Sequence, residues 1–165
     1  MFVSIARQVR LGAATAAIAL ATFSQSFGAE GPFAGLSGSW SGGGSIAMAD
    51  GSHERIHCRA HYTAGGGGHS LSQSLHCASA STSLQISANV VDQGGSLSGS
   101  WSETTRGVTG SISGHVSGST IRAQVVGGGF SAGVGINLHG DSQSVTITPS
   151  SNTDIKTVTV SMHRG

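Results

Sequence analysis

Apolar and polar residues alternate with a period of two along most of this chain. In residues 84–90, for example, Leu, Ile, Ala and Val alternate with Gln, Ser and Asn. This period is typical of a β-strand that buries one face and exposes the other. The same alternation predicts strands at residues 56–62, 71–77, 108–114, 121–125, 134–138, 145–147 and 158–162, besides two strands around the tryptophans.

Turn-forming residues separate these strands, and a strand with its turn repeats about every 8–14 residues, as in an antiparallel meander. The turns are expected at residues 65–68, 92–95, 118–119, 127–129, 140–141 and 149–152. Beyond the N-terminal segment no stretch has a helical period, which excludes parallel βαβ units. An open meander of about 8–10 strands leaves two unpaired edges, so we predict one all-β domain, residues 30–165, closed as a barrel.

The hexapeptide Leu-Ser-Gly-Ser-Trp-Ser occurs twice, at Leu36–Ser41 and at Leu97–Ser102. Both tryptophans of the protein lie in these copies, the second of which begins 61 positions after the first. Each copy places Leu, Gly and Trp at alternating positions. The repeat predicts two related strands, each with a large aromatic anchor on its buried face.

Residues 1–29 have the features of an export signal. Arg7 and Arg10 precede an Ala-rich apolar run at 11–23, which is too short to cross a membrane. Small residues follow, and the choice of a cleavage site within 26–29 stays open; a retained N-terminal anchor is the alternative. We expect a periplasmic or secreted protein of the cell envelope.

Without this segment the chain has six basic and seven acidic residues, a net charge of −1 with neutral His. No basic field is left to attract nucleic acid or an anionic bilayer, so neither is an expected partner. Gly and Ser make up more than a third of residues 30–165. Because the faces opposite the apolar rows are polar and hydroxyl-rich, we do not expect the barrel to insert into a membrane. Whether its interior is filled or hollow stays open.

The two cysteines, Cys58 and Cys77, are expected to form a disulfide, since an exported protein meets an oxidising compartment. If residues 65–69 form a turn, these positions oppose each other on neighbouring strands, with Cα atoms near ~4.5 Å apart. Closing this loop stabilises the fold by about 3 kcal/mol in the chain-entropy model.

Five histidines fall within the same predicted hairpin: His53, His57, His61, His69 and His76. On an extended strand His57 and His61 are about 13 Å apart and cannot chelate one ion. His76 is expected opposite Arg59. We therefore predict solvated surface histidines and no metal site; an alternative is that their protonation below about pH 6 changes an interaction.

The chain has no pattern that indicates catalysis. It lacks a Gly-x-Ser-x-Gly elbow, and its glycine runs at 42–44, 65–68 and 127–129 precede no helix that would bind phosphate. Glu103 and Arg106 flank the second tryptophan strand in a loop and are expected to form a salt bridge or to remain solvated charges. We predict no catalytic residue, no cofactor and no enzymatic activity.

The segment Leu36–Trp40 resembles the first strand of the calycin group, lipocalins and avidins, which implies a barrel with Gly-x-Trp closing one end. The same opening is similar to that of small bacterial inhibitors of secreted metalloproteases. In that resemblance the N-terminal tail, Ala29–Pro32, would enter the cleft of a target enzyme.

A longer resemblance is to uncharacterised exported proteins of rhizobial-type alphaproteobacteria, and it implies a location in the cell envelope. The segments that carry it are Trp40–Gly44, Glu54–Tyr62, Leu75–Ser79 and Gly99–Arg106.

The sequence thus predicts a binding module for a small apolar or amphipathic ligand, with Trp40, Tyr62, Trp101 and Phe130 lining or closing the interior. The alternative is an envelope interaction protein, perhaps protease-inhibitor-like, that acts through its outer face or its N-terminal tail. The partner would be an unidentified small molecule in the first case and an envelope protein in the second.

Overall fold

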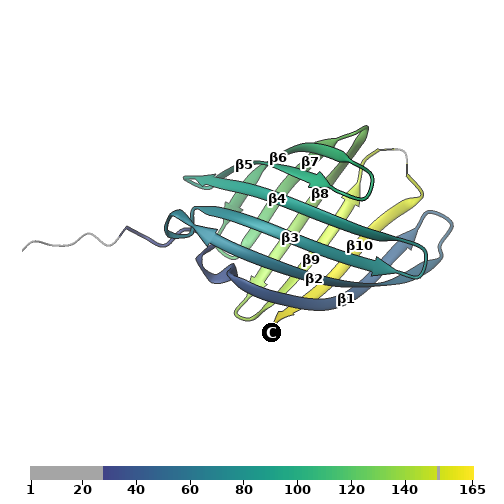
Figure 1. The fold of residues 1–165 in the computed structure, drawn as a ribbon, viewed down its shortest axis with the longest axis horizontal. Coiled ribbons are helices and arrows are strands. Elements are labelled where there is room, and N and C mark those ends of the chain that lie inside the picture. Colours follow the sequence, from purple (N-terminus) through teal and green to yellow (C-terminus); the bar gives the residue numbers. More distant parts are fainter. Residues whose placement is uncertain (1–27, 152) are drawn as a thin grey trace, which may run out of the picture.

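The computed structural model describes residues 28–151 and 153–165, so the predicted export signal lies outside the described residues except for its last two. In the described part ten antiparallel strands follow one another, each paired with the next, and β1 pairs with β10 to close a barrel (Figure 1). The predicted all-β meander and its closure are confirmed. The strands are β1 (Gly38–Met48), β2 (His53–Gly65), β3 (Ser70–Ser79), β4 (Ser83–Gln93), β5 (Ser96–Glu103), β6 (Val108–Ser117), β7 (Thr120–Gly127), β8 (Phe130–His139), β9 (Ser142–Pro149) and β10 (Ile155–Arg164).

Two short 3-10 helices, η1 (Ala34–Leu36) and η2 (Gly66–Gly68), lie at one end of this barrel. Within the described ranges, neither of these helices nor any other is long and apolar enough to cross a membrane.

The strand register follows the alternation of the sequence. The inward row of β2 contains Ile56, Cys58, Ala60 and Tyr62, all buried, while the residues between them are exposed. Cys58 lies directly opposite Cys77, and Arg59 opposite His76, as predicted. Because every strand has two neighbours, closure leaves no backbone edge unpaired.

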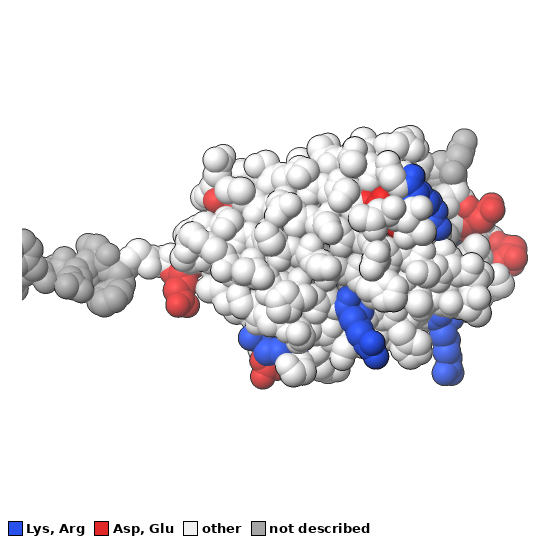
Figure 2. All heavy atoms as spheres, viewed as in Figure 1, with Lys and Arg blue, Asp and Glu red and all other residues white. Residues whose placement is uncertain are grey.

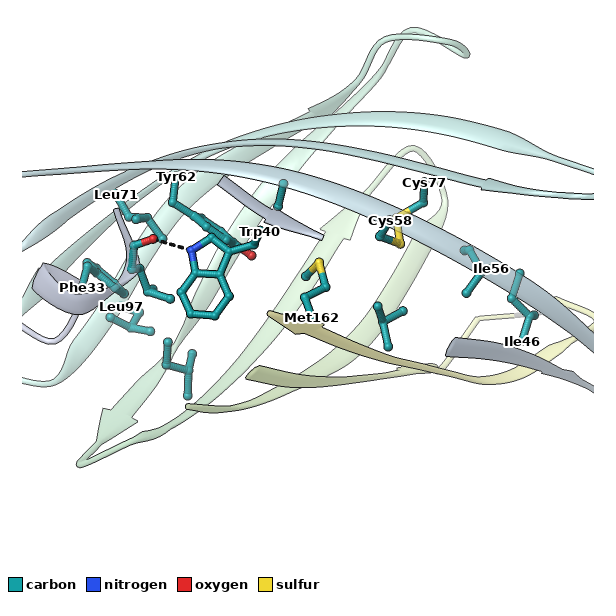
Figure 3. Packing of buried hydrophobic residues seen from close by; sticks show 14 residues of the cluster. Phe33, Trp40, Ile46, Ile56, Cys58, Tyr62, Leu71, Cys77, Leu97 and Met162 are labelled. Atoms are coloured by element: carbon teal, nitrogen blue, oxygen red, sulfur yellow. Dashed lines mark hydrogen bonds between the residues drawn. A yellow bond between two sulfur atoms is a disulfide. The ribbon is translucent and has the colours of Figure 1, made fainter. Parts of the chain in front are cut away.

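Helix η1 caps one end of the barrel. Phe33 and Leu36 are buried there, and the Trp40 Nε1–H donates a hydrogen bond of 2.8 Å to the Leu36 carbonyl (Figure 3). Arg164, at the end of β10, places its guanidinium 4.9 Å from the centre of the Trp40 ring. The same guanidinium donates to the carbonyls of Gly35 and Ser37, so it ties the end of β10 to the cap.

The packed half of the interior follows β1, β2, β3 and β10, from the cap toward the other end of the barrel, as Figure 3 shows. Leu97 and Ile121 join it near the cap. Side chains this buried contribute most of the hydrophobic stabilisation of a small domain. Its members on the four strands are Trp40, Ile46, Ile56, Cys58, Ala60, Tyr62, Leu71, Cys77, Val160 and Met162.

The predicted disulfide is confirmed. Cys58 and Cys77 are bonded across β2 and β3, with a Cα–Cα distance of 4.1 Å. The bridge faces inward and forms part of the packed half (Figure 3). It links two strands that already pair, so it fixes their register inside the closed sheet.

Inward glycines allow neighbouring strands to approach closely in this packed half. A Cβ on Gly42 would lie 1.8 Å from the Ser161 carbonyl oxygen, and one on Gly44 would lie 1.7 Å from that of Thr159. No side chain fits at those distances. The glycine run at 42–44 therefore serves the curvature of the β1–β10 wall.

Candidate ligand-binding site

The four predicted lining residues form two separate aromatic pairs. Trp40 and Tyr62 meet edge to face with ring centroids 6.3 Å apart, and Trp101 and Phe130 do so at 6.5 Å. The first pair belongs to the packed half, where Trp40 is 2% and Tyr62 is 5% exposed. The second pair lies toward the uncapped end and is partly exposed. One pair therefore fills the barrel, and the other lines an accessible part of it.

The accessible part, which we call the open half, is bordered by inward apolar side chains of β5–β9. They occupy inward register positions, yet each is partly exposed and lies outside the packed core. Protein interiors are close-packed, so inward side chains that stay partly exposed are less tightly packed than those of the core. These residues are Trp101, Ile112, Val125, Phe130, Val134 and Ile147.

The indole of Trp101 carries the one buried side-chain nitrogen or oxygen without a hydrogen-bond partner among the described residues, its Nε1. Leaving such a donor unpaired costs about 1–3 kcal/mol. The ring packs against Gly110, where a Cβ would lie 2.6 Å from Nε1. Glycine at position 110 therefore makes room for the indole. The indole N–H has no hydrogen-bond partner in this position.

A buried polar pair lies near the capped end of the barrel. Gln143 of β9 is 3% exposed, and its Nε2 donates to the Tyr62 hydroxyl at 3.2 Å. Burial raises the pKa of Tyr62, and the hydrogen bond with Gln143 opposes that rise. Gln143 was not predicted as an inward residue because the predicted strand began at residue 145, whereas β9 begins at Ser142. Leu138 of β8 and Met162 of β10 lie directly opposite Gln143 and point inward, so strand pairing could have indicated that Gln143 points inward too.

Glu103 fixes the turn that follows β5, next to Trp101. Its carboxylate accepts hydrogen bonds from the backbone N–H groups of Gln85, Thr105 and Arg106, at 3.2, 3.1 and 2.8 Å. Burial raises the pKa of Glu103, but the hydrogen bonds outweigh it and lower that pKa to about 2. The predicted ion pair with Arg106 is present at 3.6 Å, although Glu103 itself is buried, which was not expected.

The N-terminal tail is attached to the barrel from Gly31 onward. Gly31 N–H donates to the Gly67 carbonyl at 2.8 Å, and Phe33 N–H donates to that of Gly68 at 3.0 Å. A Cβ on Gly31 would lie 2.3 Å from Gly68, so this contact is close. Of the predicted inhibitory tail, Ala29–Pro32, only the residues before Gly31 extend from the structure.

Two shallow hollows mark the outer surface. One, of about 410 Å³, lies over β1–β3 and is lined by Ser39, Trp40, Ser41, Arg59, Ala60, His61, Ser74, His76 and Gly165. The other, of about 440 Å³, lies over β4–β6 and is lined by Ser87, Asn89, Ser100, Trp101, Ser102, Thr109 and Gly110. Across residues 28–151 and 153–165, no three His, Cys, Asp or Glu side chains converge as a metal site would require.

Comparison with known proteins identifies the fold but no family. No protein-family model and no curated protein match the chain. The crystal structure of Rv2717c from M. tuberculosis is similar, with a TM-score of 0.64 at 14% identity over 80% of this chain and 94% of that one. The S-type phycobiliprotein lyase CPES from Guillardia theta has a TM-score of 0.58 at 13% identity, over 81% and 90%. Both are calycin-like β-barrels, as the Leu36–Trp40 resemblance implied; the resemblance to rhizobial exported proteins stays a prediction.

Proposed function

We propose that this protein is an exported, non-enzymatic barrel that binds a small apolar or amphipathic molecule in its open half, with entry at the uncapped end. The observation that carries the proposal is the contrast inside one barrel. Inward apolar side chains are packed along β1–β3 and β10, whereas six inward apolar side chains of β5–β9, toward the uncapped end, are partly exposed and lie outside the packed core. Exposed hydrocarbon inside a concave wall gains free energy when a ligand covers it, at about 25 cal/mol per Å².

The unpartnered Trp101 Nε1–H adds a directional feature to this lining. A ligand with a hydrogen-bond acceptor near the indole would recover the free energy lost by the unpaired donor. An amphipathic ligand with a carbonyl, ether or hydroxyl oxygen among its carbon atoms matches this arrangement better than a pure hydrocarbon does.

A binding role is favoured over a catalytic one by the chemistry of the lining. The open half offers hydrocarbon, two aromatic rings and one indole N–H. None of these groups exchanges protons or acts as a nucleophile near neutral pH. The adjacent Glu103 has its carboxylate engaged by backbone N–H groups of the turn.

The test uses the fluorescent apolar probe N-phenyl-1-naphthylamine and two neighbouring valines of β7. Val125 points into the open half, whereas Val126 points outward and is 48% exposed. We expect Val125→Gln to weaken probe binding by about tenfold, because an amide then replaces hydrocarbon in the lining. Val126→Gln, the matched control on the other face of the same strand, should change affinity by less than about twofold.

A second variant, Val125→Phe, provides a test that remains valid if Val125→Gln fails to fold. Val125→Phe should fill part of the open half and block the probe, while far-ultraviolet circular dichroism keeps the β-sheet signature of the parent. Equal effects of the Val125 and Val126 variants would contradict the proposal. So would unchanged probe binding in a folded Val125→Phe protein.

A further inference from the structure

We propose that the outer surface of β1, β2, β3 and β10 binds an acidic polysaccharide, and binds it more tightly as the pH falls. This site is separate from the interior site proposed above, because its residues occupy the outward row of the same strands. We call it the basic face; it consists of Arg55, His57, Arg59, His61, His76 and His163.

Strand pairing aligns the cations of the basic face in two directions. Across the strands, His163 of β10 pairs with Ser41, Ser41 with Arg59, and Arg59 with His76. Strands lie about 4.8 Å apart, so this row spans about 14 Å. Along β2, cationic or titratable side chains recur at every second residue from Arg55 to His61, about 6.6 Å apart. The charges therefore form an extended array and do not converge on one point.

A hollow lies on this array. It has a volume of about 410 Å³, and its lining includes Arg59, His61 and His76. Serine hydroxyls from β1 and β3 complete the wall, and the Ser39 hydroxyl lies 3.3 Å from His61 Nδ1. The lining thus offers two kinds of group that bind sugars: cations for carboxylates, and hydroxyls for sugar hydroxyls.

The basic face has few acidic neighbours: Asp141 precedes Ser142, the strand partner of His163, and forms an ion pair with Arg164. Glu54 is the one acidic residue in β1, β2, β3 and β10; it has an inward register position, and its carboxylate accepts hydrogen bonds from Ser81. The three ion pairs found among the described residues use other side chains, Arg106 and Arg164 among the cations. In Figure 2, Lys and Arg side chains project from the lower edge of the barrel and at the upper right, and acidic side chains lie mostly toward its ends, including beside the basic side chain at the lower left.

The chemistry of the face favours an acidic polysaccharide over other polyanions. Outward positions of β1, β2, β3 and β10 carry no Trp, Tyr or Phe and no exposed large aliphatic side chain; the exposed Val91 and Val126 lie on β4 and β7. Protein interfaces and bilayer surfaces use such anchors. Nucleic acid needs a stronger positive field than residues 30–165 provide. A hydrated chain with carboxylates at intervals matches spaced cations set among hydroxyls.

Histidine supplies the pH dependence, since imidazole ordinarily gains its charge between pH 8 and 5. The titratable groups that face one another here are His53, His57 and His61 of β2, His76 of β3 and His163 of β10. Arg55 and Arg59 are charged throughout, and β1 contributes only Ser, Gly and Ala to the outward row. Gly165 also lines the hollow.

The test measures binding of oligogalacturonate by titration calorimetry, using disulfide-bonded protein without a C-terminal tag. We expect binding at about pH 5.5 that weakens by about tenfold at about pH 7.5. Arg59→Gln with His76→Gln should weaken binding at the lower pH by about tenfold.

The chain provides a matched control, because His115 of β6 lies directly opposite Arg122 of β7, also outward. No other Lys, Arg or His lies on β5, β6 or β7. His115→Gln with Arg122→Gln should change the affinity by less than about twofold. Both double variants replace exposed side chains, and unfolding curves will establish that each is folded.

Several results would overturn the proposal: no binding at either pH, equal affinity at both, or equal losses in the two double variants. Neutral dextran bound as tightly as oligogalacturonate would exclude recognition by charge. Tighter binding of polyglutamate, of DNA or of phosphatidylglycerol vesicles would assign the face to a different partner.

Discussion

The two copies of Leu-Ser-Gly-Ser-Trp-Ser have the same residues but different surroundings. Both place their tryptophan inward on a strand. Trp40 is 2% exposed, its N–H is bonded to Leu36, and Arg164 stacks on its ring. Trp101 stays partly exposed, and its N–H has no partner.

The first residue of each copy shows where the two surroundings differ. Leu36 belongs to η1, whose chain bends over the barrel and brings a carbonyl to the Trp40 indole. Leu97 lies inside β5, paired on both sides, so no cap forms. The hexapeptide therefore determines a strand with an inward tryptophan, and its surroundings determine whether that tryptophan fills the core or lines an open space.

The largest expected effect separates the two tryptophans by stability. Trp40→Ala should lower the free energy of unfolding by about 3–5 kcal/mol, because it leaves a cavity in the packed half. Trp101→Ala should cost about 1–2 kcal/mol, since its ring is already partly exposed and its N–H unpaired. Urea denaturation measures both. Equal losses would show that the two halves of the barrel are packed alike.

Removing the disulfide probes whether the two halves are independent. Cys58→Ala with Cys77→Ala should lower the free energy of unfolding by about 3 kcal/mol, because the bridge closes a loop with a sequence separation of 19. The bridge belongs to the packed half, so probe affinity at the open half should change by less than about twofold. A large loss of probe affinity in the folded variant would argue against separate halves.

Glu103 should make the region around Trp101 sensitive to acid. Its pKa is about 2 in the folded protein, below the ordinary value near 4.3 of an unfolded chain, so its contribution to stability is complete above about pH 4.5. That contribution is lost as the pH falls toward 2. Glu103→Gln should therefore be less stable than the parent at neutral pH, with a difference that shrinks below about pH 4.5. Urea unfolding across this range measures it, and a constant difference would contradict the assignment.

The smallest expected effect comes from Trp101→Phe. The change removes the unpaired donor and keeps an aromatic ring, so the free energy of unfolding should change by less than about 1 kcal/mol. At Trp40, the same substitution should cost more, since it discards the hydrogen bond to Leu36. Denaturation curves of the two variants, recorded side by side, test this order; a greater loss at Trp101 would reverse it.

Local patterns in the sequence were enough to predict the strands and the register of the β2–β3 hairpin. Alternation identified the inward rows, and one predicted turn placed Cys58 opposite Cys77 and Arg59 opposite His76. Pairing of adjacent strands depends on residues close in sequence, which is why these predictions are confirmed.

Closure of the barrel was predicted, but the side-chain contacts between segments distant in sequence were not. The contact of Arg164 with Trp40 links the two ends of the domain, and the Gln143–Tyr62 hydrogen bond links β9 with β2. No period or motif encodes such contacts. The division into packed and open halves has the same origin, because it depends on which inward side chains meet across the barrel.

The central claim, that one half of the interior is free to take an apolar ligand, is tested most directly by methyl NMR during titration with N-phenyl-1-naphthylamine. We expect shifts for Val125, Val134 and Ile147 and none for Ile46 and Ile56 of the packed half. Shifts confined to the packed half, or no shift in either, would contradict it.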